Sequence, residues 1–256
     1  MAILNFQKPD KIILQKATDF EAQFEFRPLE PGYGVTIGNA LRRVLLNSLE
    51  GYAIIGVKIE GVEHEFATMK GISEDVVEII LNLKQVRFKK IADHEVSNEK
   101  IILSIKNKTE FTAGMIGEGT HTFQIMNPDM LICTLDSSAR MDIELTIGKG
   151  RGYVPAEDNK PKDAILGYIP VDAIYTPIKN VKYTIENTRV EQRTDFEKLI
   201  MEVSTDGTIH PEEAVKQASR ILIQHLMIIT DENITFDNKE EKKEDMVDEQ
   251  TLQLRK

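Results

Sequence analysis

ILIQHLMII, residues 221–229, decides the fold prediction, because it places aliphatic side chains on nearly every side of one predicted helix. That helix is predicted over 211–230, with Pro211 at its first position and two glutamates behind it, where the helix dipole favours carboxylates. His210 stands where an Asp or Ser cap would be stronger. A helix that is apolar all round must be covered on more than one side.

A second amphipathic helix is predicted over 36–50. Thr36 is its expected N-cap and Gly51 its expected C-terminal stop. Its apolar residues recur at helical spacing and form one stripe, made of Ile37, Leu41, Val44, Leu45 and either Ser48 or Leu49. The spacing therefore predicts a helix that packs along one face.

Arg42, Arg43 and Leu46 lie on this second helix, off its apolar stripe. Charged side chains on a helix usually face solvent. An Arg beside an exposed Leu, however, is typical of a protein interface, and Leu46 follows Arg43 at i+3. We therefore interpret these residues as a candidate contact surface.

The remaining pattern is that of strands. FEAQFEFR (20–27) alternates apolar and polar residues, which predicts a half-buried strand. A strand pair is predicted at 181–193 and 196–204, followed by a tight turn at Asp206-Gly207. Other strands are predicted at 52–62, 86–90, 101–105, 109–113, 121–126, 131–135 and 141–148, with a short helix capped by Ser73 and an irregular loop at 148–163.

This order of elements predicts an α+β protein of two structural units. One unit holds the two long helices with the first and last strands, and the other, about 51–175, is β-rich and interrupts it. Residues 237–256 are charged and nearly free of aromatics, which predicts a flexible acidic tail.

Composition excludes several classes of protein. The chain has 256 residues and a formal net charge of -10, so it is a poor candidate for non-specific DNA binding, which depends on Lys and Arg at phosphates. It has no apolar run of about 18 residues and no signal peptide, which favours a cytoplasmic protein with no membrane contact. Cys133 is the single cysteine, which fits a reducing compartment, and its LICTL context predicts a small buried hydrophobe.

No catalytic, cofactor or metal site is predicted. The five histidines have no ligand spacing, and neither a GxSxG motif nor a cluster of aspartates occurs. GKGRGYVP (148–155) could cradle a phosphate, but it lacks the Lys-Ser/Thr ending of a P-loop and no helix is predicted behind it. Arg151 and Tyr153 make this segment a plausible partner-binding loop instead.

Five motifs resemble those of bacterial RNA polymerase alpha subunits, in order along nearly the whole chain. They are GYGVTIGNALRRVLLNSLEG (32–51), VEHEFATMKGISEDVVEIILNLK (62–84), GRGYVPAE (150–157), NTRVEQRTDFEKL (187–199) and DGTIHPEEAV (206–215). The resemblance implies a discontinuous dimerisation domain, 1–50 plus 176–236, with two long helices on an antiparallel sheet and an insert domain between. It also implies a linker after Phe236 and a C-terminal domain that binds promoter DNA and activators, which this sequence lacks.

The resemblance further implies partners and contact residues. The partners are a second copy of the chain and the beta and beta-prime subunits, with omega and sigma in the holoenzyme. Contacts to beta are implied for Arg42, Arg43, Leu46, His64, Lys70, Gly71 and Glu74, and contacts to beta-prime for Lys84 and Val171. The implied dimer interface comprises Tyr33, Ile37, Leu41, Leu222, His225, Leu226 and Ile229.

Two other functions stay open on the sequence. A stand-alone β-rich enzyme could act on phosphorylated ligands through GKGRGYVP, and a thermal-shift screen with nucleotides would test it. A dimeric adaptor could serve some other complex, and a pull-down with beta would distinguish it from a polymerase subunit.

Overall fold

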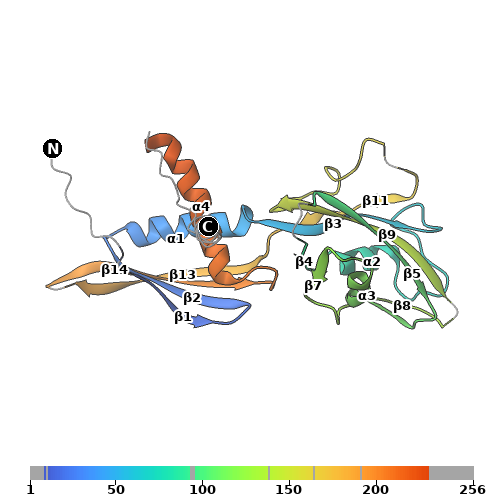
Figure 1. Cartoon of the computed structure of the whole chain (residues 1–256), viewed down its shortest axis with the longest axis horizontal. Coiled ribbons are helices and arrows are strands. Elements are labelled where there is room, and N and C mark those ends of the chain that lie inside the picture. Colours follow the sequence, from blue (N-terminus) through green and yellow to red (C-terminus); the bar gives the residue numbers. More distant parts are fainter. Residues whose placement is uncertain are drawn as a thin grey trace, which may run out of the picture. The chain divides into compact units, whose positions relative to one another are not determined.

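The computed structural model describes residues 9, 11–92, 96–137, 139–163, 165–190 and 192–230 (Figure 1). Its contacts divide the chain into two units, residues 1–220 and 221–256, with the boundary inside the last described helix. The first unit combines helices with antiparallel sheets. The predicted tail at 237–256 lies outside the described residues.

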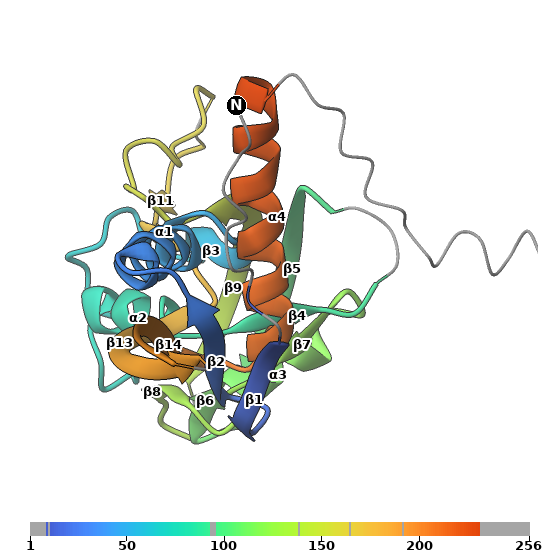
Figure 2. The ribbon, with the colours of Figure 1, turned by 90° about the vertical axis from the view of Figure 1, so that its left-hand side faces the viewer.

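The first sheet joins strands from both ends of the chain. Its order is β1 (Lys11–Ala17), β2 (Glu21–Leu29), β14 (Arg193–Thr205) and β13 (Ile178–Val190), all antiparallel. β2 and β14 therefore lie side by side although they are far apart in sequence (Figure 2). The strands predicted at 20–27, 181–193 and 196–204 are confirmed. The sequence pattern missed β1, in which a register shift between Leu14 and Lys16 breaks the alternation.

The second sheet lies in what we call the insert module, Glu50–Ile174. Its order is β11 (Tyr168–Pro170), β3 (Glu50–Ile59), β9 (Arg140–Arg151) and β5 (Asn98–Lys106). Three small sheets pair β10 (Tyr153–Val154) with β12 (Ala173–Ile174), β4 (Phe88–Lys90) with β7 (Phe123–Ile125), and β6 (Glu110–Thr112) with β8 (Leu131–Thr134). Helices α2 (Val76–Leu83) and α3 (Ala113–Glu118) share one hydrophobic core with these strands, except for β10 and β12, which pack in a separate small cluster. The predicted strands are confirmed, and only α3 and the shortest strands were missed.

Helix α1 (Tyr33–Asn47) packs closely on β13 and β14 because glycines line its buried side (Figure 1). A Cβ added to Gly38 would lie 2.9 Å from Cδ2 of Tyr183 and 3.0 Å from Cδ1 of Leu199. The buried stripe is therefore Gly34, Gly38, Leu41 and Leu45. The predicted stripe was right at its two central leucines and at Leu49, whereas Ile37 and Val44 are only half-buried.

The predicted ends of α1 were wrong. The helix begins at Tyr33, and its N-cap is Gly32 in the left-handed conformation, with φ +86°. Gly32 has no side chain to cap the helix, and the carboxylate of Glu197 on β14 takes that role by accepting the N–H groups of Gly32 and Gly34, both at 2.8 Å. Thr36 lies inside the first turn, and Gly51 belongs to β3.

Replacing Glu197 with alanine is expected to lower the free energy of unfolding by about 1–2 kcal/mol, because two N–H groups at a helix N-terminus lose their acceptor. Urea unfolding of the whole chain measures this loss. Glu202→Ala is the matched control, since Glu202 lies in the same strand and its carboxylate is largely exposed. The control is expected to change stability by less than about 0.5 kcal/mol, and an equal loss in both variants would contradict a capping role.

Two further local predictions were wrong. Ser73 does not cap α2; Asp75 does, accepting the N–H of Glu78 at 2.7 Å while the Glu78 carboxylate accepts that of Asp75. Glu25, on the supposedly exposed face of β2, is buried, because it pairs with Arg27 at 2.6 Å and accepts a hydrogen bond from Gln15. A short pattern does not reveal such pairing.

Helix α4 (Pro211–Thr230) begins and ends where the sequence predicted. Its first half is buried at Ala214, Val215 and Ala218. His210 caps it better than expected, since its Nδ1 accepts the N–H of Glu212 at 3.3 Å. The first half of α4 thus belongs to the core of the first unit, and its second half, from Ile221, belongs to the other unit.

Candidate docking surfaces

The exposed side of α1 presents Arg43, which has no partner among the residues that the structure describes. Arg43 is exposed and makes no hydrogen bond or ion pair with another described residue. Arg42 is already engaged, because its Nε donates to the carbonyl of Val181 on β13 at 3.1 Å. Leu46 is half-buried beside them. Of the two arginines that the sequence singled out, Arg43 is therefore the one whose charge is available to another protein.

The N-terminal part of α1 carries apolar side chains at its surface. Tyr33 and Val35 are exposed and Ile37 is half-buried. Val35 was missed because it lies off the predicted stripe. Leu41, by contrast, is only 4% exposed within its own chain, so it can add little area to a contact with another chain. The exposed apolar side chains of α1 are therefore Tyr33 and Val35, whereas Leu41 packs within its own chain.

The second half of α4 is strongly apolar and open. The exposed fractions of Leu226, Ile228 and Ile229 are 57%, 82% and 77%. Leu222 is half-buried, and the exposed His225 ring bonds through Nδ1 to the carbonyl of Ile221 at 2.7 Å. Exposed aliphatic residues gathered on one helix mark an interaction site in most soluble proteins.

A groove of about 480 Å³ runs beside α2 and brings together Lys84 and Val171. The Lys84 ammonium forms an ion pair with Asp172 at 2.6 Å. Val171 is buried and shapes the floor of the groove, where its N–H donates to the carbonyl of Ile55. Phe66, which is 78% exposed, also lines the groove. The sequence predicted the first two residues and missed Phe66, although it stands in the HEFATMKG motif.

The residues predicted around 64–74 divide into two groups. His64 and Lys70 are exposed. Gly71 and Glu74 instead shape the backbone: Gly71 has φ +81°, and the Glu74 carboxylate accepts the N–H of Thr134 at 2.7 Å. Only the exposed pair can therefore contact a partner through side chains without rearrangement.

The glycine-rich segment at 148–155 is not the irregular loop that the sequence predicted. β9 continues to Arg151, and the glycines make room for neighbouring side chains: a Cβ on Gly150 would lie 2.4 Å from the Tyr175 ring. Lys149 and Arg151 both pair with Glu50, at 2.8 and 2.6 Å. Their hydrogen bonds and charges hold the pKa of the Glu50 carboxyl below its usual range. These contacts leave little positive charge for a phosphate.

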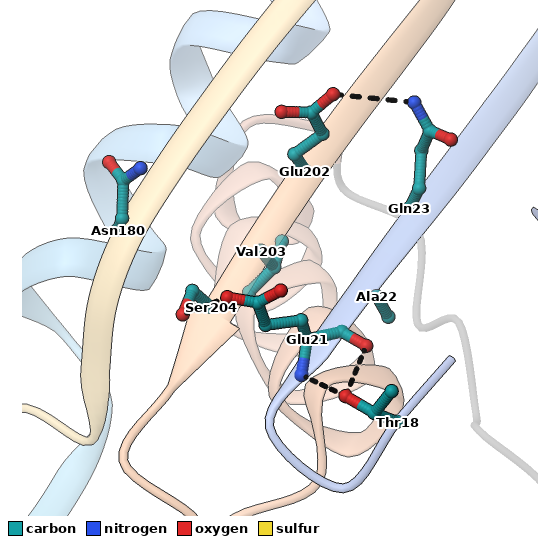
Figure 3. Close-up of a pocket in the computed structure, with 8 residues that line it drawn as sticks. All are labelled: Thr18, Glu21, Ala22, Gln23, Asn180, Glu202, Val203 and Ser204. Atoms are coloured by element: carbon teal, nitrogen blue, oxygen red, sulfur yellow. Dashed lines mark hydrogen bonds between the residues drawn. The ribbon is translucent and has the colours of Figure 1, made fainter. Parts of the chain in front are cut away.

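The first sheet has a polar hollow of about 330 Å³ on one side, shown in Figure 3. Its carboxylates already bond within the chain: Glu202 accepts from Gln23 at 3.4 Å, and Glu21 accepts from Ser204 at 3.4 Å. Among the described residues, no group of three or more His, Cys, Asp or Glu could hold a metal ion.

Comparison with known proteins gives a consistent family. Residues 57–176 match the family model for the RNA polymerase Rpb3/RpoA insert domain. The chain is 61% identical over 256 residues to a protein of Cytophaga hutchinsonii, covering 100% of this chain and 77% of that protein. It is 54% identical over 255 residues to proteins of Flavobacterium psychrophilum and Bacteroides thetaiotaomicron, with the same coverage. All three are named DNA-directed RNA polymerase subunit alpha.

The chain belongs to the DNA-directed RNA polymerase alpha subunit family. Alpha subunits are parts of the enzyme that transcribes DNA, so this chain has a subunit role in DNA-directed transcription. The matched insert domain falls largely within the insert module, Glu50–Ile174. In the described part of this alpha-subunit chain, no helix combines the length and apolar character needed to cross a membrane.

Cys133 lies in the insert core of this alpha-subunit family member, where burial, and then the charge of Glu74, raise the pKa of its thiol to about 12. The thiolate is the reactive form, so the folded chain at pH 8 is expected to resist thiol reagents. Labelling with and without urea checks this, and denatured protein should react fully. Rapid labelling in buffer would contradict the buried placement.

Proposed function

We propose that the chain homodimerises and scaffolds the beta and beta-prime subunits for DNA-templated transcription, without a catalytic site of its own. The observation that supports this most is the exposed apolar end of α4, with Leu226, Ile228 and Ile229 open to solvent in the single chain. A second copy is the occupant that the family membership favours.

The proposed dimer has enough apolar surface to be obligate. Burying about 2,000 Å² in total would yield roughly 50 kcal/mol gross at ~25 cal/mol/Å², most of which is offset by association and ordering costs. Tyr33, Val35 and Ile37 on α1 would add to the area supplied by α4. Leu41 would contribute indirectly, by holding α1 on its own sheet.

Docking of the large subunits is proposed at two places. Arg43 and Leu46 on α1, with His64 and Lys70, would contact beta, while the groove beside α2 would contact beta-prime through Lys84 and Phe66. A symmetric dimer presents each surface twice. The two large subunits differ, so they would occupy the copies unequally.

We also propose that 1–50 plus 176–236 form the dimerisation domain and 51–175 the insert domain. The sheet that combines β1 and β2 with β13 and β14 supports this division, as does the family match at 57–176. Omega and sigma would join in the cytoplasmic holoenzyme, and promoter DNA and activators would be reached through a C-terminal domain beyond this sequence.

The mass of the isolated chain in solution, followed by assembly with purified beta and then beta-prime, tests the proposal. Sedimentation should give a dimer at micromolar concentration, and that dimer should bind both beta and beta-prime. A folded monomer at that concentration, or a dimer that binds neither subunit, would refute it.

A further inference from the structure

Arg87 connects the insert module to the turn between β14 and α4. It lies between α2 and β4, and its Nη1 donates to the carbonyl of Ile174, at the end of β12, at 3.3 Å. Its Nε lies 3.7 Å from Oδ2 of Asp206, just after β14. The chain leaves the insert module at Ile174, so one guanidinium holds both the exit from that module and the turn beside it.

Both ends of this contact are held in place by their neighbours. The N–H of Arg87 donates to Oδ1 of Asn127 at 3.0 Å. The Asp206 N–H donates to the carbonyl of Pro177 at 2.9 Å, and its Oδ1 accepts the N–H of Thr208 at 2.9 Å. The backbones of both residues are therefore held by bonds other than the pair itself, so the pair joins two parts that are already formed.

The surroundings of the pair exclude most water. The Asp206 side chain is only 5% exposed and that of Arg87 23%. At the next residue, a Cβ on Gly207 would lie 2.5 Å from the Phe20 ring and 3.2 Å from Cε of Met126. Met126 belongs to the insert module and Phe20 precedes β2, so side chains from both the insert module and the first sheet pack against this turn. A carboxylate with so little water depends on its remaining partners far more than a surface carboxylate does.

We propose that Arg87 is a positioning residue that fixes the insert module against the β14–α4 turn. It thereby sets the spacing between Arg43 on α1 and the exposed His64 and Lys70 of the insert module. All three are proposed to contact beta, so their spacing must match that one partner. This role rests on the proposed docking function. It differs from that function because Arg87 itself need not contact a partner.

Arg87→Met and Asp206→Asn test the proposal in the whole 256-residue chain, with Arg140→Met as the control. Arg140 pairs with Asp142 at 2.6 Å within a single strand of the insert module and is mostly exposed, so it joins nothing across the junction. Spin labels at Lys106 on β5 and Lys182 on β13 report the distance between the modules. Dilution with unlabelled chain leaves one labelled copy per dimer.

The distance distribution should be narrow in the original chain and in Arg140→Met, and broader in Arg87→Met and Asp206→Asn. The double variant should be no broader than either single variant, because both remove the same contact. Binding to beta should weaken about tenfold in the two junction variants only. The urea midpoint for unfolding of the insert module, measured through the reactivity of Cys133, should stay unchanged. An unchanged midpoint would show that the variants alter the position of the module and do not unfold it.

Unchanged distance widths in Arg87→Met and Asp206→Asn would overturn the proposal. Broader distributions with unaltered beta binding would overturn the claim that this spacing matters for docking. If the original chain itself bound no beta, the proposed docking function would fail, whereas the distance measurements would still decide whether Arg87 holds the modules together.

Discussion

Aspartate at both Leu226 and Ile229 is expected to convert the proposed homodimer into a monomer. Both side chains are exposed in the single chain, so two carboxylates there cost the monomer little. In the dimer each would be buried without a partner, at a cost of several kcal/mol. The dimer dissociation constant should therefore rise by at least about 1,000-fold, which corresponds to ~4 kcal/mol. Sedimentation velocity across a concentration series measures the change.

Ile102→Asp provides a matched control for that experiment. Ile102 is 74% exposed, close to the value for Ile229, but it lies on β5 of the insert module. The control should remain a dimer with unchanged dissociation constant. A double variant that stays dimeric would show that the chain associates through a different surface, and loss of circular dichroism would show unfolding instead.

Arg43→Ala is expected to leave the dimer intact and to weaken binding of beta by about 2–5 kcal/mol, provided Arg43 enters a buried charge pair with beta. The side chain is exposed and bonds to no other described residue, so its removal costs the free chain little. The missing charge would leave a partner carboxylate unpaired in the complex. Titration of the dimer into labelled beta measures the loss.

Arg42→Ala separates docking from folding, because Arg42 already donates to the carbonyl of Val181. That variant should lower the free energy of unfolding by about 1 kcal/mol, the contribution of one hydrogen bond. Arg140→Ala should change neither stability nor binding appreciably. Normal co-purification of Arg43→Ala with beta would remove Arg43 from the docking surface.

Much of the fold was predictable from local pattern. The start and end of α4 followed from Pro211 and the aliphatic run, and the β13–β14 pair followed from alternation on both sides of a short connection. These signals are contained within one element or within neighbouring elements. The order of helices and strands also predicted an insert domain, and in the structure Glu50–Ile174 lies in sequence between β2 and β13 of the first sheet.

The errors arose where a distant residue supplies the decisive contact. The start of α1 depends on Glu197, and no pattern near Gly32 reveals a carboxylate that arrives from β14. Similarly, the GKGRG segment looked like a flexible basic loop because its pairing with Glu50 and its packing on Tyr175 join separate strands. Glycine in these places meets a packing requirement, and sequence alone does not distinguish that from flexibility.

The candidate surfaces were predicted in part. Family motifs located Lys84 and Val171, which the structure brings to one groove, and they located Arg43 on the open side of α1. Motifs did not separate side chains that reach solvent from those that support the backbone. Leu41, Gly71 and Glu74 therefore appeared beside Tyr33 and Lys70 as equals, although only the last two are exposed.

The pairing of β2 with β14 also has a consequence for synthesis on the ribosome. Roughly 160 residues separate these strands, so at about 5–20 residues per second β2 waits on the order of 10 s for its neighbour. The insert module is translated entirely within that interval and contains its own core. We therefore expect it to fold first on the nascent chain, while the phenylalanines of β2 remain available to chaperones until translation is nearly over.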